Sequence, residues 1–241
     1  MSQLMTRRER VRAGTVAEIK ELAWQQLATT GPLALSLRAI AREMQVTSSA
    51  LYRYFPSREA LLAALVCDGF ASLADALEEA DEQARAHPGP PGDRWLRVAG
   101  AHRRWALAHP TAYSLVFGSG CDGYEIELPA IKEQMFRGAG VLFRVMIESI
   151  ESGECDPSGL HERLTEPMRA QLAEWRKDLG VADVDLDEAG LSAGLFAWTA
   201  LHGAVALELF EHLPPQFLPA DAYFDQTMRY VLEILGCRSA S

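Results

Sequence analysis

Hydroxyl, phenol and guanidinium side chains gather in one short stretch of the sequence, residues 36–58. Such groups donate hydrogen bonds to the phosphates and base edges of a nucleic-acid duplex. Hydroxyl residues at the start of a helix add to this, because free backbone N–H groups and the positive end of the helix dipole attract phosphate there. The stretch therefore predicts DNA contacts by nine side chains: Ser36, Arg38, Thr47, Ser48, Ser49, Tyr52, Arg53, Tyr54 and Arg58.

Two short helices must position these side chains. Ser36 is expected to cap the first helix, which carries apolar residues at helical spacing over 37–44. After a break at residues 45–46, Thr47 or Ser48 caps a second helix that reaches about Tyr54. Apolar residues supply the inward face: Val46, Ala50, Leu51 and Phe55. This pattern predicts a helix-turn-helix, whose second helix can enter the major groove.

Helical periodicity continues along the rest of the chain, and strand signals are nearly absent. Glycine and proline interrupt it at Gly31–Pro32, Pro56 and His109–Pro110. Beyond the two short helices, we expect helices at about 8–29, 58–85, 93–108, 111–118, 128–152, 160–179, 187–212 and 220–236. The predicted fold is all-α, with a three-helix head over residues 1–58 that contains the helix-turn-helix. A larger helical domain follows over residues 59–241.

Charge is distributed unevenly along the chain. The formal net charge is −10, yet residues 1–58 hold nine basic and four acidic side chains, and the remaining residues hold 14 basic and 29 acidic ones. This asymmetry is expected when one end of a protein binds the phosphates of a nucleic acid and the rest of the protein does not contact them. A chance fluctuation of surface charge is the alternative.

The helix-turn-helix stretch resembles the DNA-binding head of the tetracycline-repressor (TetR) family. The residues that match the family pattern are Ala41, Glu43, Val46, Thr47, Leu51, Tyr52, Tyr54, Phe55, Ser57, Arg58, Glu59, Leu61 and Leu62. The resemblance implies that eight of the nine polar residues above occupy positions used on DNA, and that the position of Arg53 varies with operator sequence. Gln45 stands where the family usually has glycine, and a left-handed glutamine costs about 1 kcal/mol relative to glycine. Either the turn differs or the strain is tolerated.

Two later segments are similar to a subgroup of these regulators whose effector domain is named for a Trp-His-Gly signature. They are residues 109–118 and the run Trp198-x-x-x-His202-Gly203. The resemblance implies a homodimer joined through the helices near 187–212 and 220–236. It also implies a ligand cavity among the effector helices, which makes residues 59–241 a ligand-binding and dimerisation domain.

Bulky apolar and histidine side chains would line such a cavity. The candidates are His102, Trp105, Tyr113, Phe117, Met135, Phe136, Phe143, Trp198 and His202. Each of them is equally expected in a plain core. His202 has two interpretations: a pocket wall that hydrogen-bonds a ligand, or a buried histidine bonded to a backbone carbonyl at the dimer seam.

Catalytic and cofactor motifs are absent from the sequence. It has no G-x-S-x-G, no phosphate-binding G-x-x-x-x-G-K-[ST], no H-E-x-x-H, and no strand followed by G-x-G-x-x-G. We expect no enzyme and no cofactor. Cys155, Asp156, His161 and Glu162 are potential metal ligands, but their spacing matches no structural zinc pattern, so no metal is expected.

Cysteine and hydropathy patterns bear on the compartment. The four cysteines lie far apart without a C-x-x-C pair, so we expect neither a disulfide framework nor a zinc ribbon. No signal peptide is visible, and a reduced, cytoplasmic protein is expected. Residues 191–207 lack charged side chains, but both flanks are acidic, which favours a buried helix over a membrane span.

These patterns together predict a transcriptional regulator that acts as a homodimer on a palindromic double-stranded DNA operator. A repressor released by an unknown small-molecule effector is expected, with the helix at about 58–85 transmitting the change. Two alternatives stay open. One is an effector-independent DNA-binding dimer whose cavity is filled by side chains, and the other is an all-α small-molecule-binding or catalytic protein.

Overall fold

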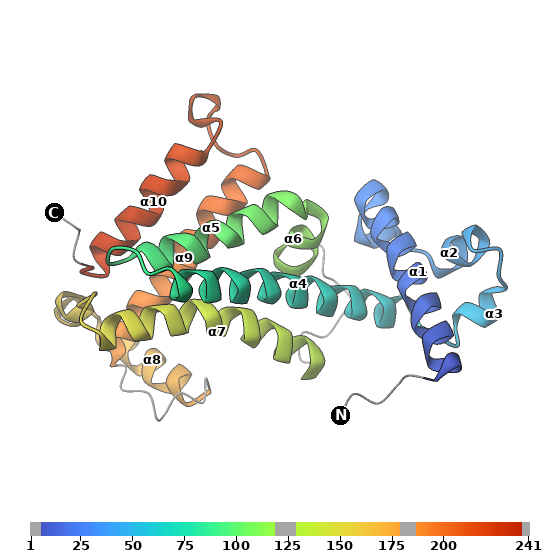
Figure 1. Ribbon diagram of the computed structural model, residues 1–241, viewed down its shortest axis with the longest axis horizontal. Helices are drawn as coiled ribbons and strands as arrows, with labels where there is room; N and C mark the ends of the chain where they lie inside the picture. Colours follow the sequence, from blue (N-terminus) through green and yellow to red (C-terminus); the bar gives the residue numbers. More distant parts are fainter. Residues whose placement is uncertain (1–5, 119–128, 179–186, 238–241) are drawn as a thin grey trace. The chain divides into compact units, whose positions relative to one another are not determined.

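The computed structural model describes residues 6–118, 129–178 and 187–237 (Figure 1). Within these ranges the chain forms ten α-helices and three short 3-10 turns and no strand, so the predicted all-α class is confirmed. The helices are α1 (Arg7–Thr30), α2 (Leu37–Glu43), α3 (Ser48–Leu51), α4 (Arg58–Ala86), α5 (Asp93–Ala108), α6 (Pro110–Phe117), α7 (Pro129–Glu151), α8 (Glu166–Asp178), α9 (Glu188–Leu209) and α10 (Asp221–Ile234). The 3-10 turns are η1 (Pro32–Ala34), η2 (Pro157–Arg163) and η3 (Pro215–Phe217), none of which the sequence periodicity predicts.

Two compact units divide the helices, and both are discontinuous in sequence. Unit 1 takes its described residues from 1–72 and 109–135, and unit 2 takes its own from 73–108 and 136–241. Residues of α4 and of α7 therefore belong to both units, whereas α5 lies in unit 2 and α6 in unit 1. The predicted head over residues 1–58 lies within unit 1.

Unit 1 begins with a helix that is closed at both ends by local signals. The Thr6 hydroxyl accepts from the Glu9 N–H, and the Glu9 carboxylate accepts from the Thr6 N–H, which completes a capping box. Gly31 ends α1 at a φ of 75°, in the left-handed region that glycine tolerates. Buried side chains of α1, α2, the α3 segment and the start of α4 form the core of this unit: Ile19, Ala23, Leu27, Leu37, Ile40, Leu51, Phe55, Leu61, Leu62 and Leu65.

Helix α6 also belongs to unit 1, although it begins about fifty residues after the start of α4. It packs against α1, and the Phe117 ring contacts Phe70 of α4 edge-on at 5.7 Å between centroids. Gly69 lies so close to Val116 that an added Cβ would come within 2.9 Å of it. An ion pair of 2.8 Å between the Lys20 Nζ and the Asp68 carboxylate joins α1 to α4. The first part of α4 is thus held from two sides within unit 1.

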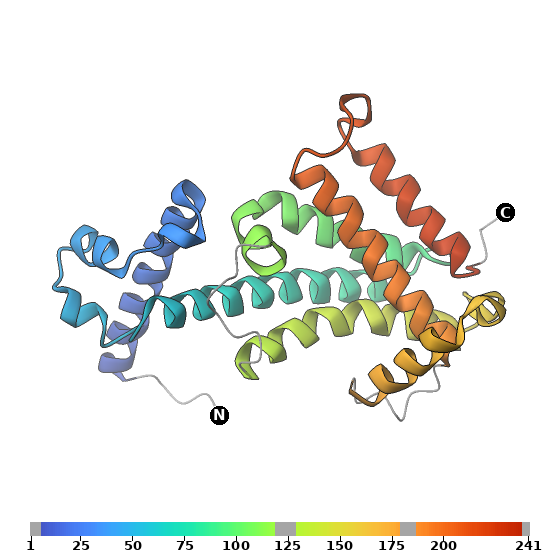
Figure 2. The same cartoon turned by 180° about the vertical axis from the view of Figure 1, so that it is seen from behind.

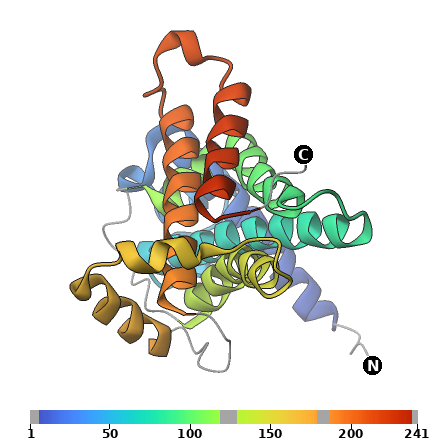
Figure 3. The same cartoon turned by 90° about the vertical axis from the view of Figure 1, so that its left-hand side faces the viewer.

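Helix α9 is the central element of unit 2. It packs against α5, α8, α10 and η2, and Figures 2 and 3 show it beside α10, in orange and red. Its inward face is built from small and aliphatic residues, including Ala193, Ala197, Leu201 and Val205. Arg103 of α5 bonds Glu208 of α9 at 2.6 Å and Asp221 of α10 at 2.8 Å, so one guanidinium links three helices.

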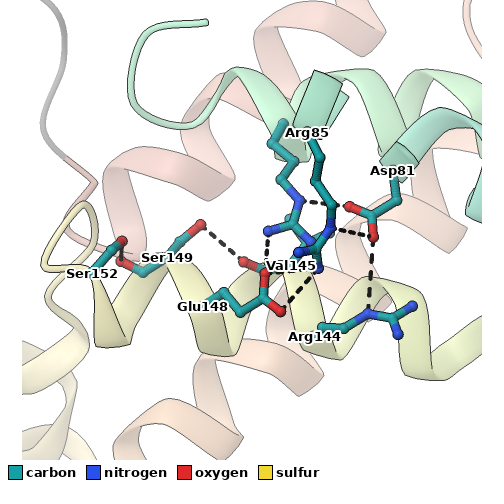
Figure 4. Close-up of polar contacts among 8 residues, drawn as sticks. Asp81, Arg85, Arg144, Val145, Glu148, Ser149 and Ser152 are labelled. Atoms are coloured by element: carbon teal, nitrogen blue, oxygen red, sulfur yellow. Dashed lines mark hydrogen bonds and ion pairs between the residues drawn. The ribbon is translucent and has the colours of Figure 1, made fainter. Parts of the chain in front are cut away.

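A second charged cluster joins α4, α5 and α7 within unit 2 (Figure 4). The Asp81 carboxylate is 4% exposed and accepts from Arg94 at 2.6 Å and from Arg85 at 3.2 Å. Both arginines also bond Glu148. Burial raises the pKa of Asp81, but the hydrogen bonds and charges of Arg94 and Arg85 outweigh it, so the net pKa lies below its ordinary value.

The structure corrects one expectation about the cysteines. A disulfide joins Cys155 to Cys237, although the sequence analysis expects a reduced chain without one. The two residues are 82 positions apart, and only the packing of the end of α10 against the turn after α7 brings them together. Cys67 is a free thiol.

Among the residues that the structure describes, two helices are long and apolar enough to cross a membrane by length and composition, α4 and α9. In the structure 56% of the most apolar window of α4 and 44% of that of α9 are buried against other parts of the protein. Core helices of soluble proteins meet the same criteria.

Candidate nucleic-acid interface

The candidate interface is built on α2, α3 and the turn between them (Figure 1). Ser36 caps α2 by accepting from the Ala39 N–H at 3.3 Å, and Thr47 caps α3 by accepting from the Ala50 N–H at 3.3 Å. Gln45 adopts a φ of 56° in the turn, so the left-handed conformation is present with glutamine in place of glycine. The Val46 N–H then donates to the Ala41 carbonyl at 2.9 Å, which closes the turn.

Helix α3 is shorter than the periodicity predicts. It covers Ser48–Leu51, and residues 52–54 continue as a hydrogen-bonded turn in which the Tyr54 N–H donates to the Leu51 carbonyl at 2.9 Å. Leu51 and Phe55 anchor this segment in the core, as expected. Val46 does not: it is 42% exposed, which corrects its assignment to the inward face. The turn at Gln45 directs it outward instead.

Five of the nine predicted contact residues have exposed side chains: Arg38, Thr47, Ser49, Tyr52 and Arg53. The Thr47 and Ser49 hydroxyls lie 3.1 Å apart at the start of α3. Arg38 and Tyr52 line an open groove of about 430 Å³ together with Ser36 and Ser57. No ion pair joins Arg38, Arg42 or Arg53 to an acidic residue among the described parts of the chain, so their charges face solvent. The surface offers hydroxyl, phenol and guanidinium donors from α2, α3 and the residues that flank α3.

Three of the other four predicted contacts, Ser36, Tyr54 and Arg58, have protein partners. The Arg58 Nη2 donates to the Pro32 carbonyl at 2.6 Å, which ties η1 to the start of α4. The Arg12 guanidinium lies over the Tyr54 ring, 5.1 Å from its centroid. Ser36 and Ser48 are half-buried, and the Ser36 N–H donates to the side-chain carbonyl of Gln26 at 3.0 Å.

Sequence reasoning missed Arg12 and Gln26, which support the interface from α1. Neither belongs to a spacing pattern. The basic run at the start of the chain was the one available signal for Arg12, and nothing in the sequence indicates that Gln26 meets the residue that caps α2.

The nine predicted pocket residues are divided between the two units. Tyr113, Phe117 and Met135 belong to unit 1, and the other six belong to unit 2. Phe136 is 50% exposed. In unit 2, Phe143 and Trp198 line a cavity of about 10 Å³ with Trp95, Leu142, Met146 and Gly194, which is close to the space that one water needs.

Two histidines face each other beside that cavity. The rings of His102 on α5 and His202 on α9 lie 4.8 Å apart between centroids, and Trp198 lies 4.0 Å from His202. Burial lowers the pKa of His102 well below its ordinary value, and the neighbouring His202 lowers it further. Burial also lowers the pKa of His202, to about 4. Both rings are therefore neutral at pH 7.

Metal ligation finds no support in the described residues. They contain no group of three or more histidine, cysteine, aspartate or glutamate side chains that could hold an ion. Cys155, the first of the candidate ligands, is bonded to Cys237. The His161 side chain lies outside the described part of the chain.

Comparison with known families decides which helix-turn-helix class this is. Residues 19–65 match the model of bacterial regulatory proteins of the tetR family, and residues 95–231 match the tetracyclin repressor-like C-terminal domain. The chain belongs to the TetR family. Both matched segments lie in the order that the resemblance of the sequence implies, so that expectation is confirmed.

Individual relatives of this TetR-family chain are regulators as well. It is 30% identical over 230 residues to the HTH-type transcriptional regulators Rv1816 of Mycobacterium tuberculosis and Mb1846 of Mycobacterium bovis, covering 91% of this chain and 92% of each relative. The crystal structure of the regulatory protein SCO4313 aligns with a TM-score of 0.74 at 31% identity, covering 95% of this chain and all of the other. A tetR-family protein from Rhodococcus RHA1, 16% identical with a TM-score of 0.63, shares the fold. The protein is a DNA-binding transcriptional regulator.

Proposed function

We propose that the protein is a cytoplasmic repressor that binds a palindromic operator as a homodimer and leaves it when a small-molecule effector binds. It acts through binding rather than catalysis. The single observation that carries the DNA contact is the exposed donor surface of α3 and its flanks, with Arg38, Tyr52 and Arg53 outside the core of unit 1. Phosphate contacts by such side chains position the protein, and contacts to base edges select the sequence.

The proposed dimer forms through α9 and α10. Helix α9 and its C-cap residue carry a second apolar stripe at spacings of seven, four and three residues, formed by Phe196, Gly203, Leu207 and Phe210. Its three large members are 39–41% exposed, and Tyr230 and Ile234 of α10 are 54% and 43% exposed. An added Cβ at Gly203 would meet no atom within 4 Å, so a partner helix has room to approach the backbone there. Exposed apolar patches on soluble proteins often mark interaction sites, which supports a dimer interface on this stripe.

The two-fold symmetry of this proposed dimer determines how the two halves of the operator are arranged. A dimer of helix-turn-helix heads reads two half-sites whose centres lie about 34–36 Å apart, on one face of the duplex. An effector that prefers a conformation with another head spacing weakens DNA binding by its differential affinity. Helix α4 is the proposed connection, because its residues belong to both units.

The proposed effector site lies among the apolar walls near His102, His202 and Trp198. As it stands, the cavity lined by Phe143 and Trp198 has about 10 Å³, whereas small-molecule sites usually have roughly 300–1,000 Å³. Effector binding would therefore open this region. The same observation favours a second candidate function, a DNA-binding dimer without an effector, in which side chains fill the cavity.

Selection of DNA from a random duplex pool tests the proposal. We expect an enriched palindrome, bound in gel shifts by two chains per duplex. Inserting five base pairs between the half-sites should abolish tight binding, because it turns them to opposite faces of the helix. Enrichment of single half-sites bound by one chain would contradict the dimer. A thermal-shift screen with small metabolites then separates the two candidates, since only an effector-responsive repressor is stabilised by a ligand that also releases the operator.

A further inference from the structure

The Cys155–Cys237 disulfide closes a junction between two loops at the end of unit 2. Cys155 follows the turn after α7, and Cys237 comes three residues after α10. Their Cα atoms are 3.8 Å apart. The Asp156 N–H donates to the Gly236 carbonyl at 3.3 Å, so backbone contact accompanies the bond.

Backbone packing at this junction is close on both sides. Gly236 has a φ of 66°, and a Cβ there would lie 2.2 Å from the Asp156 carbonyl oxygen. Only glycine fits this conformation and this approach. The Cys155 N–H donates to the Ser149 carbonyl of α7 at 3.0 Å. These contacts accompany the disulfide and place the two cysteines opposite each other.

The two cysteines differ in their exposure to solvent. Cys155 is 5% exposed, whereas Cys237 is only partly buried. A reagent from solution therefore reaches Cys237 first, and Cys155 is held beside it to complete the exchange. Disulfides in cytosolic proteins are mostly transient or redox-sensing.

We propose that Cys155 and Cys237 are a reversible thiol–disulfide modification site that fixes or frees the end of α10. Hydrogen peroxide transfers one oxygen atom to the Cys237 thiolate in a two-electron oxidation, and with the uptake of one proton from solvent the products are a sulfenic acid and water. The Cys155 thiol attacks that sulfur, the S–S bond forms, and a second water leaves. A dithiol reverses the reaction by attacking Cys237, which displaces the Cys155 thiolate. Its second thiol then releases Cys237, and the dithiol becomes a disulfide.

Cys67 provides the matched control within the same chain. It is a free, partly exposed thiol on α4, and its Sγ lies 3.5 Å from the Ala130 carbonyl. Burial and the neighbouring Asp68 raise the pKa of Cys67, which lowers its thiolate fraction and its reactivity. Exchange at Cys155 and Cys237 should therefore be selective.

Mass spectrometry of the native full-length protein tests the chemistry. After peroxide treatment we expect a linked pair of peptides containing Cys155 and Cys237, and after dithiothreitol under native conditions we expect both peptides free. Cys155→Ser should abolish the linked pair, and Cys67→Ser should leave it unchanged. Failure of the pair to form, or failure of a formed pair to open in native protein, would overturn the proposal.

Stability and hydrogen exchange test the conformational consequence. The oxidised protein should melt about 5–15 °C above the reduced one, because the bond joins residues 82 positions apart in the sequence and so closes a long loop. Amides at the end of α10 should exchange faster after reduction, and the doubly substituted C155S/C237S protein should not respond to redox state. Equal melting temperatures and equal amide exchange in both redox states would rule out the proposal that the disulfide fixes the end of α10.

The link to regulation rests on the proposed dimer interface, which uses α10. If reduction frees α10, operator affinity of wild-type protein should differ between the two redox states by at least about threefold, and that of C155S/C237S should not. Loss of all DNA binding in both states, with normal peptide exchange, would contradict the proposed function and leave the modification site intact.

Discussion

Gln45 holds a left-handed backbone conformation at the centre of the helix-turn-helix, with a φ of 56°. Its side chain is exposed, so nothing buried compensates for the steric cost of a Cβ in this region. The surrounding contacts impose the conformation, since the Val46 N–H must reach the Ala41 carbonyl to close the turn. The backbone strain at Gln45 is therefore tolerated because it allows the turn between α2 and α3 to close.

Replacing this residue should stabilise the protein. Gln45→Gly is expected to raise the free energy of unfolding by about 1 kcal/mol, because glycine adopts φ > 0 without a steric penalty. Gln25→Gly is the matched control: Gln25 is exposed on α1. The same substitution in a helix interior should lower stability by about 1 kcal/mol. Urea unfolding of both variants measures the two changes, and an equal sign for both would refute the explanation.

Arg38 is the sharpest test of phosphate contact at the residue scale. It is exposed, lines the groove beside Tyr52, and has no acidic partner among the described residues. Arg38→Ala should weaken operator binding roughly tenfold or more. It should reduce the slope of log affinity against log salt by about 1.8, which is about 0.9 for each subunit of the proposed dimer. Arg104→Ala removes the same charge from an exposed position on α5 and should leave both quantities unchanged. Equal effects of the two substitutions would show a general charge effect instead of a contact.

Elements are joined in unit 2 by buried charges as well as by apolar packing. The cluster in Figure 4 connects α4, α5 and α7 through Asp81, whose carboxylate meets three arginines, with Arg144 at 3.9 Å. Removing one partner of such a group leaves the other charges partly desolvated, and that penalty exceeds the gain from the original pair.

Asp81→Asn should accordingly lower the free energy of unfolding by about 2–3 kcal/mol. Asp93→Asn is the control, because Asp93 pairs with Arg97 one turn later and both side chains are partly exposed. That change should stay within about 0.5 kcal/mol. Chemical denaturation at pH 7 distinguishes them, and similar losses in the two variants would remove the special role of Asp81.

Helix positions were predictable because their ends carry local signals. Gly31–Pro32 ends α1, Thr47 caps α3 and His109–Pro110 separates α5 from α6, each within a few residues of the expected place. Contacts between distant segments were not predictable. The bond between Cys155 and Cys237 and the contact between Gln26 and Ser36 depend on how helices pack, and no period in the sequence encodes them. Arg58 matches the family pattern, yet its guanidinium is directed to the Pro32 carbonyl, which a motif cannot reveal.

The whole molecule should respond to acid through its histidine pair. The pKa of His202 is lowered to about 4 and that of His102 lies well below its ordinary value. Below about pH 6.5 the unfolded chain therefore binds protons on these histidines that the folded protein does not bind. The stability that the neutral histidines contribute is fully present above about pH 6.5 and is lost as the pH falls from 6.5 towards 4. The loss attributable to His202 is on the order of 2–3 kcal/mol.

His202→Gln should make this dependence shallower by the contribution of His202, since the glutamine takes up no proton in the window. His102 keeps its own contribution. His212→Gln alters an exposed histidine and should preserve the wild-type profile. Thermal unfolding between pH 4.5 and 7.5 measures the slopes. A wild-type profile that stays level over this range would contradict the buried neutral pair.

Assembly is the second property of the whole molecule. Leu207→Glu places a charge in the exposed apolar stripe of α9 and should convert the proposed dimer into a monomer, with a parallel loss of operator binding. Leu107→Glu makes the same change at a similarly exposed leucine on α5 and should leave the dimer intact. Light scattering after size-exclusion chromatography gives the masses, and dimeric L207E protein would place the interface elsewhere.

The discontinuity of unit 1 has a consequence for building hybrid regulators. Helix α6 packs on α1 and sets Phe117 against Phe70, so the environment of the DNA-reading helices is completed by residues beyond position 108. A graft that transfers the first 58 residues alone would seat a foreign α1 on the recipient's α6. Transplanting the specificity of this protein therefore calls for two inserts, one through the first half of α4 and another spanning α6.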